Sequence, residues 1–323
     1  MEIIDILKLR YGLNPVFIKH HRNVYKVQTV EKTYSLKVYD WPVHHNFHYE
    51  LHRQLKNNGF NYFPQVIPTL DGSNSAIDSN LIYILSEWIE GVKPSFSNKD
   101  HLKNASAFLG SFHLAALISD QGILSKGPND FLLPYSFFDV RVGQYRNGVI
   151  YEKLIEWVQQ FGTDPLRIAQ ERMEYAAYIF PLDIYKELVE TEEEKNTFIH
   201  GDYNNSNVIL STKGQMYVID FDDSSSYLRV SDLIFLCHLY MGKEGEWLLD
   251  ILKSYHRVRP LSELEFEFIK SQLFVPGKIY WEMHTKSFLD QQVSKEWIYQ
   301  NLSMYCVYTV YQKIKMLSYS DLF

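Results

Sequence analysis

Cysteine is scarce in this chain. Of its 323 residues only Cys237 and Cys306 are cysteines, and both lie in apolar stretches of helical pattern. A framework of disulfides is therefore not indicated. The first residues, Met1–Lys8, carry charge too early for a signal peptide. No run approaches the ~18 apolar residues that a membrane helix needs. The sequence therefore predicts synthesis in the cytoplasm, in a reducing compartment, and no membrane partner.

Basic charge is also limited. Lys and Arg number 32 against 39 Asp and Glu, which gives a net charge of −7 and a pI of about 5.9. A basic footprint is lacking, so nucleic acid is not predicted as a partner. The hydrophobic fraction of 46% and the charged fraction of 22% are those of a globular protein. A chain of this length exceeds one compact core, so two lobes are expected.

The stretch with the most chemistry begins after an apolar pair, Phe198-Ile199. This pair is followed directly by His200-Gly201-Asp202, and Asn207 lies five positions after Asp202. A second strand-like run then delivers Asp220-Phe221-Asp222. Asp202 can take a proton from a hydroxyl, while Asn207 and Asp220 supply hard oxygen ligands for Mg²⁺. Protein kinases have His-Arg-Asp, four residues and Asn, and then Asp-Phe-Gly, so the Asp-to-Asn spacing is the same here.

These motifs resemble the aminoglycoside phosphotransferase and choline kinase superfamily, which shares the protein-kinase-like fold. Within it, the chain is similar to the CotS-type group associated with bacterial spore coats. The subgroup likeness is carried by Val66–Gly72, Ser86–Gly91, Ser254-Tyr255 and Pro260–Ser262.

The resemblance implies an α+β, two-lobed, protein-kinase-like fold. Residues 1–90 would form a small nucleotide-binding β-sheet lobe with one helix, including the hinge strand. Residues 91–323 would form a larger, mostly α-helical lobe that contains the catalytic loop and binds the acceptor. A kinase Ala-Pro-Glu segment is absent between Asp222 and Phe323, which argues against a protein substrate.

Three strands of a meander are predicted at Val16–Ile18, Asn23–Thr29 and Thr33–Tyr39. Lys37 lies in the third, and Ser35 shares its face because side chains alternate along a strand. The resemblance places Ser35 beside the nucleobase and Lys37 on the α/β phosphates. The alternative for Lys37 is a solvated strand lysine.

The turn between the first two strands is predicted at Lys19–Arg22. A kinase would cover the phosphates there, yet this turn has no glycine. Close phosphate cover by backbone amides is therefore in question, and attraction would fall more on Lys37, the metal and Arg22.

Residues 44–58 have a helical pattern. Glu50 is the only carboxylate between Trp41 and Leu70, so it is the candidate to hold Lys37 in place. By resemblance, the hinge would present the backbone groups of Glu87 and Ile89 to the edge of the adenine.

Two histidines and one further acid are interpreted structurally. His200 is assigned to brace the catalytic loop rather than to transfer protons, and His113 is interpreted as a core histidine. Ser231 or Asp232 is expected to cap the following helix, and Asp232 is not assigned a catalytic role.

Two functions follow. The first is transfer of a phosphoryl group from ATP (or GTP), with Mg²⁺, to a hydroxyl of a small acceptor molecule. Asp202 would orient or deprotonate that hydroxyl. The second is a structural spore-coat component that keeps the kinase fold with little or no activity and has other coat proteins as partners. The sequence does not identify the acceptor, because its specificity would lie in the irregular segment 120–150 and the C-terminal helices.

Overall fold

The protein divides into two compact units in a computed structural model. The first comprises Met1–Pro94 with Asn205–Asp222, and the second Ser95–Asn204 with Asp223–Phe323. A segment from late in the chain thus completes the first unit. Segment 120–150 and Arg22 lie outside the described residues. The described residues are 2–21, 24–39, 45–117, 156, 158–181, 184, 185, 187, 188, 190, 191, 198–226, 228–242, 244–275 and 308–323.

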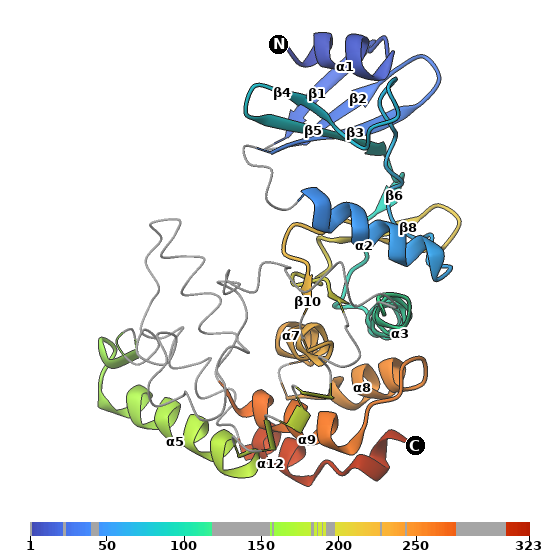
Figure 1. Cartoon of the computed structure of the whole chain (residues 1–323). Coiled ribbons are helices and arrows are strands. Elements are labelled where there is room, and N and C mark those ends of the chain that lie inside the picture. The colour runs from blue at the N-terminus through green and yellow to red at the C-terminus, as the bar shows by residue number, and fades with distance from the viewer. Residues whose placement is uncertain are drawn as a thin grey trace. The chain divides into compact units, whose positions relative to one another are not determined.

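An antiparallel sheet forms most of the first unit, with strand order β1-β2-β3-β5-β4 (Figure 1). The predicted meander is confirmed, but its first turn was placed wrongly. Lys19, His20 and His21 continue the first strand, because His21 still pairs with Val24 across the hairpin. The strands are β1 (Phe17–His21), β2 (Val24–Gln28), β3 (Thr33–Tyr39), β4 (Ala76–Asp78) and β5 (Leu81–Glu87).

One face of this sheet is covered by helix α1 (Ile3–Tyr11) (Figure 1). Ile6 and Leu7 of the helix are fully buried against Val27 and Leu36 of the sheet. Each such side chain contributes about 1.5–3 kcal/mol on burial. Because side chains alternate along a strand, the neighbours of these core residues face the other side of the sheet.

A second, smaller sheet has the order β6-β8-β9. Gly91 of β6 lies so close to β8 that a Cβ would come within 2.3 Å of the Leu210 carbonyl oxygen, so only glycine fits. At the end of the β8–β9 hairpin, the Ile219 N–H donates to the Asn207 carbonyl at 2.9 Å. This bond places Asp220 beside Asn207. The elements, with the neighbouring helix, are β6 (Gly91–Val92), β8 (Val208–Ser211), β9 (Met216–Val218) and α2 (His45–Asn57).

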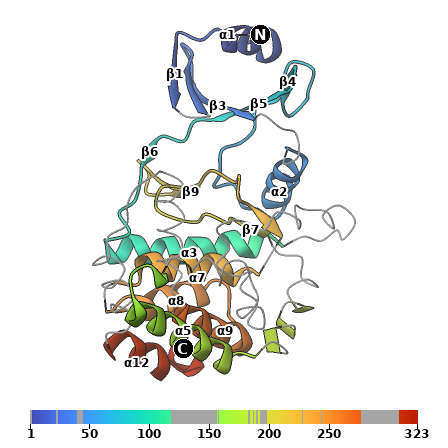
Figure 2. The same cartoon turned by 90° about the vertical axis from the view of Figure 1, so that its left-hand side faces the viewer.

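The second unit is mainly helical. Within it α3 packs along α8 and α7, and α5 packs against α9 (Figure 2). A two-stranded ladder pairs β7 with β10. Over the described residues, no helix is both long and apolar enough to cross a bilayer. The elements are α3 (Lys99–Ala115), α5 (Thr163–Ile179), β7 (Phe198–Ile199), β10 (Ser225–Ser226), α7 (Val230–Tyr240), α8 (Leu248–His256), α9 (Glu263–Phe274), α12 (Tyr308–Met316) and a 3-10 turn (Tyr319–Leu322).

Candidate active site

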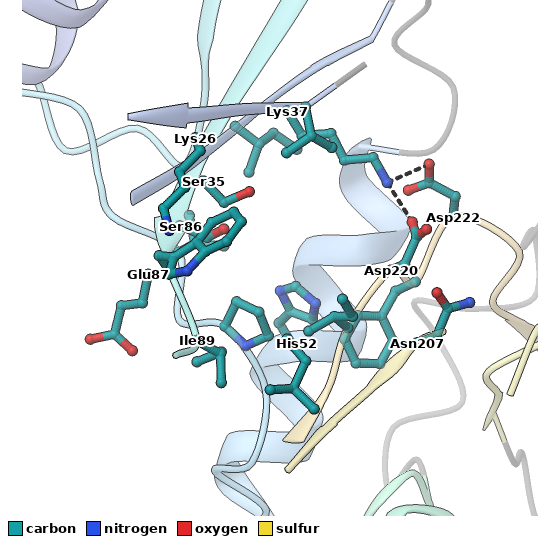
Figure 3. A pocket seen from close by; sticks show the side chains of 18 of the residues that line it. Lys26, Ser35, Lys37, His52, Ser86, Glu87, Ile89, Asn207, Asp220 and Asp222 are labelled. Atoms are coloured by element: carbon teal, nitrogen blue, oxygen red, sulfur yellow. Dashed lines mark hydrogen bonds and ion pairs between the residues drawn. The ribbon is translucent and has the colours of Figure 1, made fainter. Parts of the chain in front are cut away.

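A cavity of about 770 Å³ lies within the first unit, on the face of the sheet opposite α1 (Figure 3). Its volume falls in the ~300–1,000 Å³ range of small-molecule sites. The strands β2, β3 and β5, the hinge segment after β5 and the end of the β8–β9 hairpin line it. Of the residues predicted from the sequence, the cavity brings together Ser35, Lys37, Glu87, Ile89, Asn207 and Asp220.

Lys37 holds two carboxylates inside the cavity. Its Nζ lies 2.6 Å from Asp220 Oδ1 and 2.6 Å from Asp222 Oδ2 (Figure 3). Burial lowers the pKa of Lys37, but the charges of Asp222 and Asp220 outweigh it and raise the pKa above its ordinary value. The lysine is therefore a permanent cation between two anions.

Tyr39, one alternation further along β3, also belongs to this cluster. Its hydroxyl donates to Asp222 Oδ1 at 2.9 Å. Burial, with the nearby Asp222 charge, raises the pKa of Tyr39 far above its usual range, so the phenol stays a donor. The tyrosine hydroxyl thus fixes one oxygen of the Asp222 carboxylate.

Asp220 has a left-handed backbone, with φ of 68°. Aspartate is one of the few residues with a side chain that tolerates this region, at a cost of about 1–2 kcal/mol. Such a conformation is found where the surroundings impose it, often at functional sites. Here it occurs directly after the Ile219–Asn207 backbone bond, at the residue whose carboxylate meets Lys37.

The donor set fits a magnesium ion. Asp220, Asp222 and Asn207 offer carboxylate and amide oxygens, the ligands that Mg²⁺ prefers, and Mg²⁺ takes few of them from protein. The Lys37 ammonium already shows that the carboxylate pair accepts a cation. Two carboxylates against one lysine leave a formal charge of −1, which attracts a further cation.

The hinge segment after β5 lines the cavity. The N–H of Glu87 donates to the Gln65 carbonyl at 2.9 Å, and the N–H of Trp88 donates to Thr33 at 3.3 Å. The N–H of Ile89 has no acceptor within the described residues. In a strand the N–H and C=O of one residue point the same way. The Glu87 carbonyl thus points away from β3, and Ile89 supplies a donor two residues later.

Glu50 is not brought to Lys37. Between these two described residues no ion pair forms, because Glu50 pairs with Arg53 of its own helix and accepts from Gln54 at 3.3 Å. The hydrogen bond from Arg53 is the main reason that the pKa of Glu50 is lowered. The role predicted for Glu50, pairing with Lys37, is taken by Asp220 and Asp222.

His200 and Asp202 lie in the second unit, on the turn after β7. Gly201 between them has φ of 83°, and a Cβ there would come within 2.0 Å of the Asp223 carbonyl oxygen. Only glycine can therefore occupy this position. His200 is fully buried, and its Nδ1 accepts from the Asp202 N–H at 3.3 Å.

The Asp202 side chain is oriented by its neighbours. The side-chain amide of Asn204 donates to Asp202 Oδ1 at 2.7 Å and to its carbonyl oxygen at 3.2 Å. The buried Tyr203 hydroxyl donates to the Ala105 carbonyl in α3 at 2.8 Å. The turn is thus anchored to a core helix while Asp202 remains half-buried.

Asp232 of α7 binds the backbone of the same turn through hydrogen bonds. Its carboxylate accepts from the N–H of His200 at 2.7 Å, from the N–H of Gly201 at 2.9 Å and from His113 Nε2 at 3.0 Å. Burial acts to raise the pKa of Asp232, but the hydrogen bond and charge of His113 lower it on balance. The predicted capping role of Ser231 or Asp232 is wrong, because α7 already begins at Val230 and both residues are buried inside it.

His113 is a core histidine, as predicted, and it is also the first link of a buried chain of hydrogen bonds. Its Nδ1 lies 2.8 Å from the Tyr255 hydroxyl, which accepts from Arg229 at 2.8 Å. Arg229 in turn donates to Glu265 at 2.6 Å, at the start of α9. Since the Asp232 carboxylate can only accept, His113 Nε2 donates to it.

Sequence reasoning underused two residues of the first unit. Asp222 was seen as part of an acid pair but not assigned a role, although it binds Lys37 as closely as Asp220 does. Tyr39 was missed altogether. Alternation along the strand would have placed Tyr39 on the Lys37 face.

The comparisons with known proteins agree with this architecture. An aminoglycoside phosphotransferase from Alicyclobacillus acidocaldarius is 16% identical, with a TM-score of 0.76 and 98% of each chain covered. A spectinomycin phosphotransferase crystallised with ADP and spectinomycin is 15% identical, with a TM-score of 0.54. The match covers 94% of the present chain and 92% of the phosphotransferase. The choline kinase of Streptococcus pneumoniae is 16% identical, with a TM-score of 0.51 and coverage of 93% and 94%.

The fold is a mixed α+β kinase-like fold, with an N-terminal antiparallel sheet and a helical C-terminal part, as the sequence predicted. Residues 17–266 match the phosphotransferase enzyme family, and the chain belongs to that family.

Proposed function

We propose that this protein transfers the γ-phosphoryl group of ATP, or of GTP, to a hydroxyl of a small molecule, with Mg²⁺. The observation that carries the proposal is the Lys37–Asp220–Asp222 cluster, which faces a cavity of ligand size (Figure 3). A lysine held between two carboxylates that suit a metal ion fits phosphoryl transfer, because that chemistry depends on positioning and charge neutralisation.

At the nucleotide end, each lining group has a distinct part. The Glu87 carbonyl and the Ile89 N–H would meet the edge of an adenine, which offers a donor and an acceptor. The small Ser35 side chain leaves room beside the base. Lys37 would hold the phosphates, and Asn207 and Asp220, with Asp222, would hold Mg²⁺. The metal, when bound, neutralises charge on the transferred phosphoryl group.

At the acceptor end, Asp202 would accept or orient the hydroxyl proton, while the buried His200 braces its turn. Five residues of chain span at most ~18 Å, so the Asp202 backbone is never far from Asn207. Spectinomycin and choline, named for two similar structures, are small molecules with hydroxyl groups. These two names support the proposal that the acceptor is a small molecule with a hydroxyl group.

Nucleotide binding by the wild type is the first test. ATP with Mg²⁺ should raise the unfolding midpoint, by about 2–5 °C at ten times the dissociation constant. Lys37→Ala should abolish the shift because the phosphates lose their cation. Lys32→Ala, on an exposed turn outside the cavity, is the matched control and should keep the shift. Differential scanning fluorimetry measures all three proteins.

A second test separates the two metal ligands. Asp220 contributes a charged oxygen and Asn207 a neutral one, so Asp220→Ala should weaken Mg²⁺-dependent ATP binding more than Asn207→Ala. Titration calorimetry at several Mg²⁺ concentrations would measure it. Equal Mg²⁺ dependence in the wild type and both variants would count against this metal site.

The second candidate function is a spore-coat component of CotS type, with weak or no activity and other coat proteins as partners. The glycine-free hairpin connection favours it, because glycine-rich turns give backbone amides close access to phosphates. The two candidates differ in the first test. A wild type that shows no shift at millimolar ATP with Mg²⁺ supports the structural role instead.

A further inference from the structure

The cavity side of the β1–β5 sheet presents cross-strand rows of side chains. Residues in register on neighbouring antiparallel strands point to the same face, so one row can be read directly from the pairing. His21 pairs with Val24, Val24 with Lys37, and Lys37 with Ile84. All four residues line the cavity. His21 therefore belongs to the same row and the same face as Lys37.

The spacing of this row suits an extended anion. Neighbouring strands lie ~4.8 Å apart, so the backbones of His21 and Lys37 are separated by roughly 10 Å across β2. Two long side chains that face a cavity over this distance can bind different oxygens of a polyphosphate. Val24, which lies between them, has no polar group that could compete.

The side chain of His21 is also available to bind a ligand. Among the described residues, it has no hydrogen bond, ion pair or ring contact. Lys37 is engaged by Asp220 and Asp222, and Lys26, in the next row, lies 3.6 Å from Glu90 and 4.3 Å over the Trp88 ring. Of the lysines among the described residues that line the cavity, the third is Lys93, which follows β6.

The hairpin itself explains why a side chain is needed. Because His21 pairs with Val24, only two residues connect the strands, and neither is glycine. A backbone-amide cradle for phosphate needs glycine at close approach. Side chains of the strands must then replace those amides.

We propose that His21 is a phosphate-binding residue for a nucleoside polyphosphate, donating an imidazole N–H to a phosphate oxygen two strands away from Lys37. This inference rests on the proposed function and assigns to a side chain what glycine-rich turns do with backbone amides.

The test compares two adjacent histidines. His20 is the matched control, because it lies on the opposite face and stacks on Tyr25 with ring centroids 4.3 Å apart. Titration calorimetry gives the dissociation constants of ATP·Mg²⁺ and of adenosine for the wild type, His21→Ala, His21→Lys, His20→Ala and Lys93→Ala. His21→Ala should weaken ATP about 10-fold and leave adenosine unchanged. His21→Lys should recover most of the loss, and His20→Ala should bind both ligands as the wild type does.

Several outcomes overturn the inference. Equal ATP affinity in His21→Ala and His20→Ala would remove His21 from the phosphate site. A parallel loss of adenosine and ATP would show a distorted cavity rather than a lost phosphate contact. A loss in Lys93→Ala with none in His21→Ala would put the phosphates on the hinge side. If the wild type binds neither ligand, the proposed function itself fails, which is a different result from ATP binding that ignores His21.

Discussion

Asp202→Asn is expected to lower turnover by roughly 10²–10⁴-fold, the range for loss of a general base. The asparagine keeps the shape of the side chain and its neighbour Asn204, but it cannot take a proton. ATP binding should be unchanged, because the groups assigned to the nucleotide lie in the cavity of the first unit. Turnover is to be measured with the acceptor that reacts fastest in a screen of aminoglycosides, amino alcohols and sugars.

A companion variant tests how Asp202 is oriented. Asn204→Ala removes the amide that holds Asp202 Oδ1 at 2.7 Å and leaves the carboxylate in place. It should cost about 10-fold in turnover, which is less than Asp202→Asn. Wild-type turnover in Asp202→Asn would remove this residue from the mechanism. A loss of ATP-induced stabilisation in the same variant would show instead that the fold is damaged.

Asp232→Asn is expected to lower the free energy of unfolding by about 3–5 kcal/mol, as for other buried pairs broken on one side. The carboxylate accepts from two backbone N–H groups and from His113, whereas an amide brings N–H groups of its own into the same place. Asp250→Asn is the matched control in the same unit. It breaks a partly exposed pair with Lys99 at 2.8 Å, and should cost no more than ~1 kcal/mol.

The stabilising effect of Asp232 should depend on pH in one direction. Its pKa is lowered in the folded protein, so its contribution is present above the ordinary aspartate value of about 4 and is lost as pH falls through the folded value. The difference in stability between wild type and Asp232→Asn should therefore shrink as pH drops below about 4. Denaturant titrations at neutral and acid pH measure it, and a constant difference would show that Asp232 is not ionised in the folded state.

Much of the fold could be predicted because its signals are local. Strand alternation around Lys37, the apolar stripe of α1 and the spacing from Asp202 to Asn207 all depend on residues close in sequence. The family followed from those same motifs. The end of β1 was misplaced because Lys19–His21 look like a polar turn, and only pairing with β2 shows that they remain in the sheet.

The site was harder to predict in full because its contacts are long-range. Glu50 was chosen since no other acid was near in sequence, yet the partners of Lys37 come from residues 220 and 222. Asp232 looked like a helix cap because caps are defined by local sequence, whereas its bonds to His200 and Gly201 depend on packing of α7 against the turn. Hydrophobic periodicity contains no information on such pairs.

The composition of the first unit has a consequence for biosynthesis. Its sheet is encoded by the first 94 residues, but the hairpin with Asn207 and Asp220 is translated only after the first helices of the second unit. At ordinary rates of synthesis, on the order of ten seconds separate the two segments on the ribosome. During that interval the nascent sheet exposes the face that the late hairpin will cover. Chaperones that bind exposed sheet surfaces would therefore meet the first unit before its hairpin has been made. A chain truncated before residue 205 would lack the hairpin and keep that face of the sheet exposed.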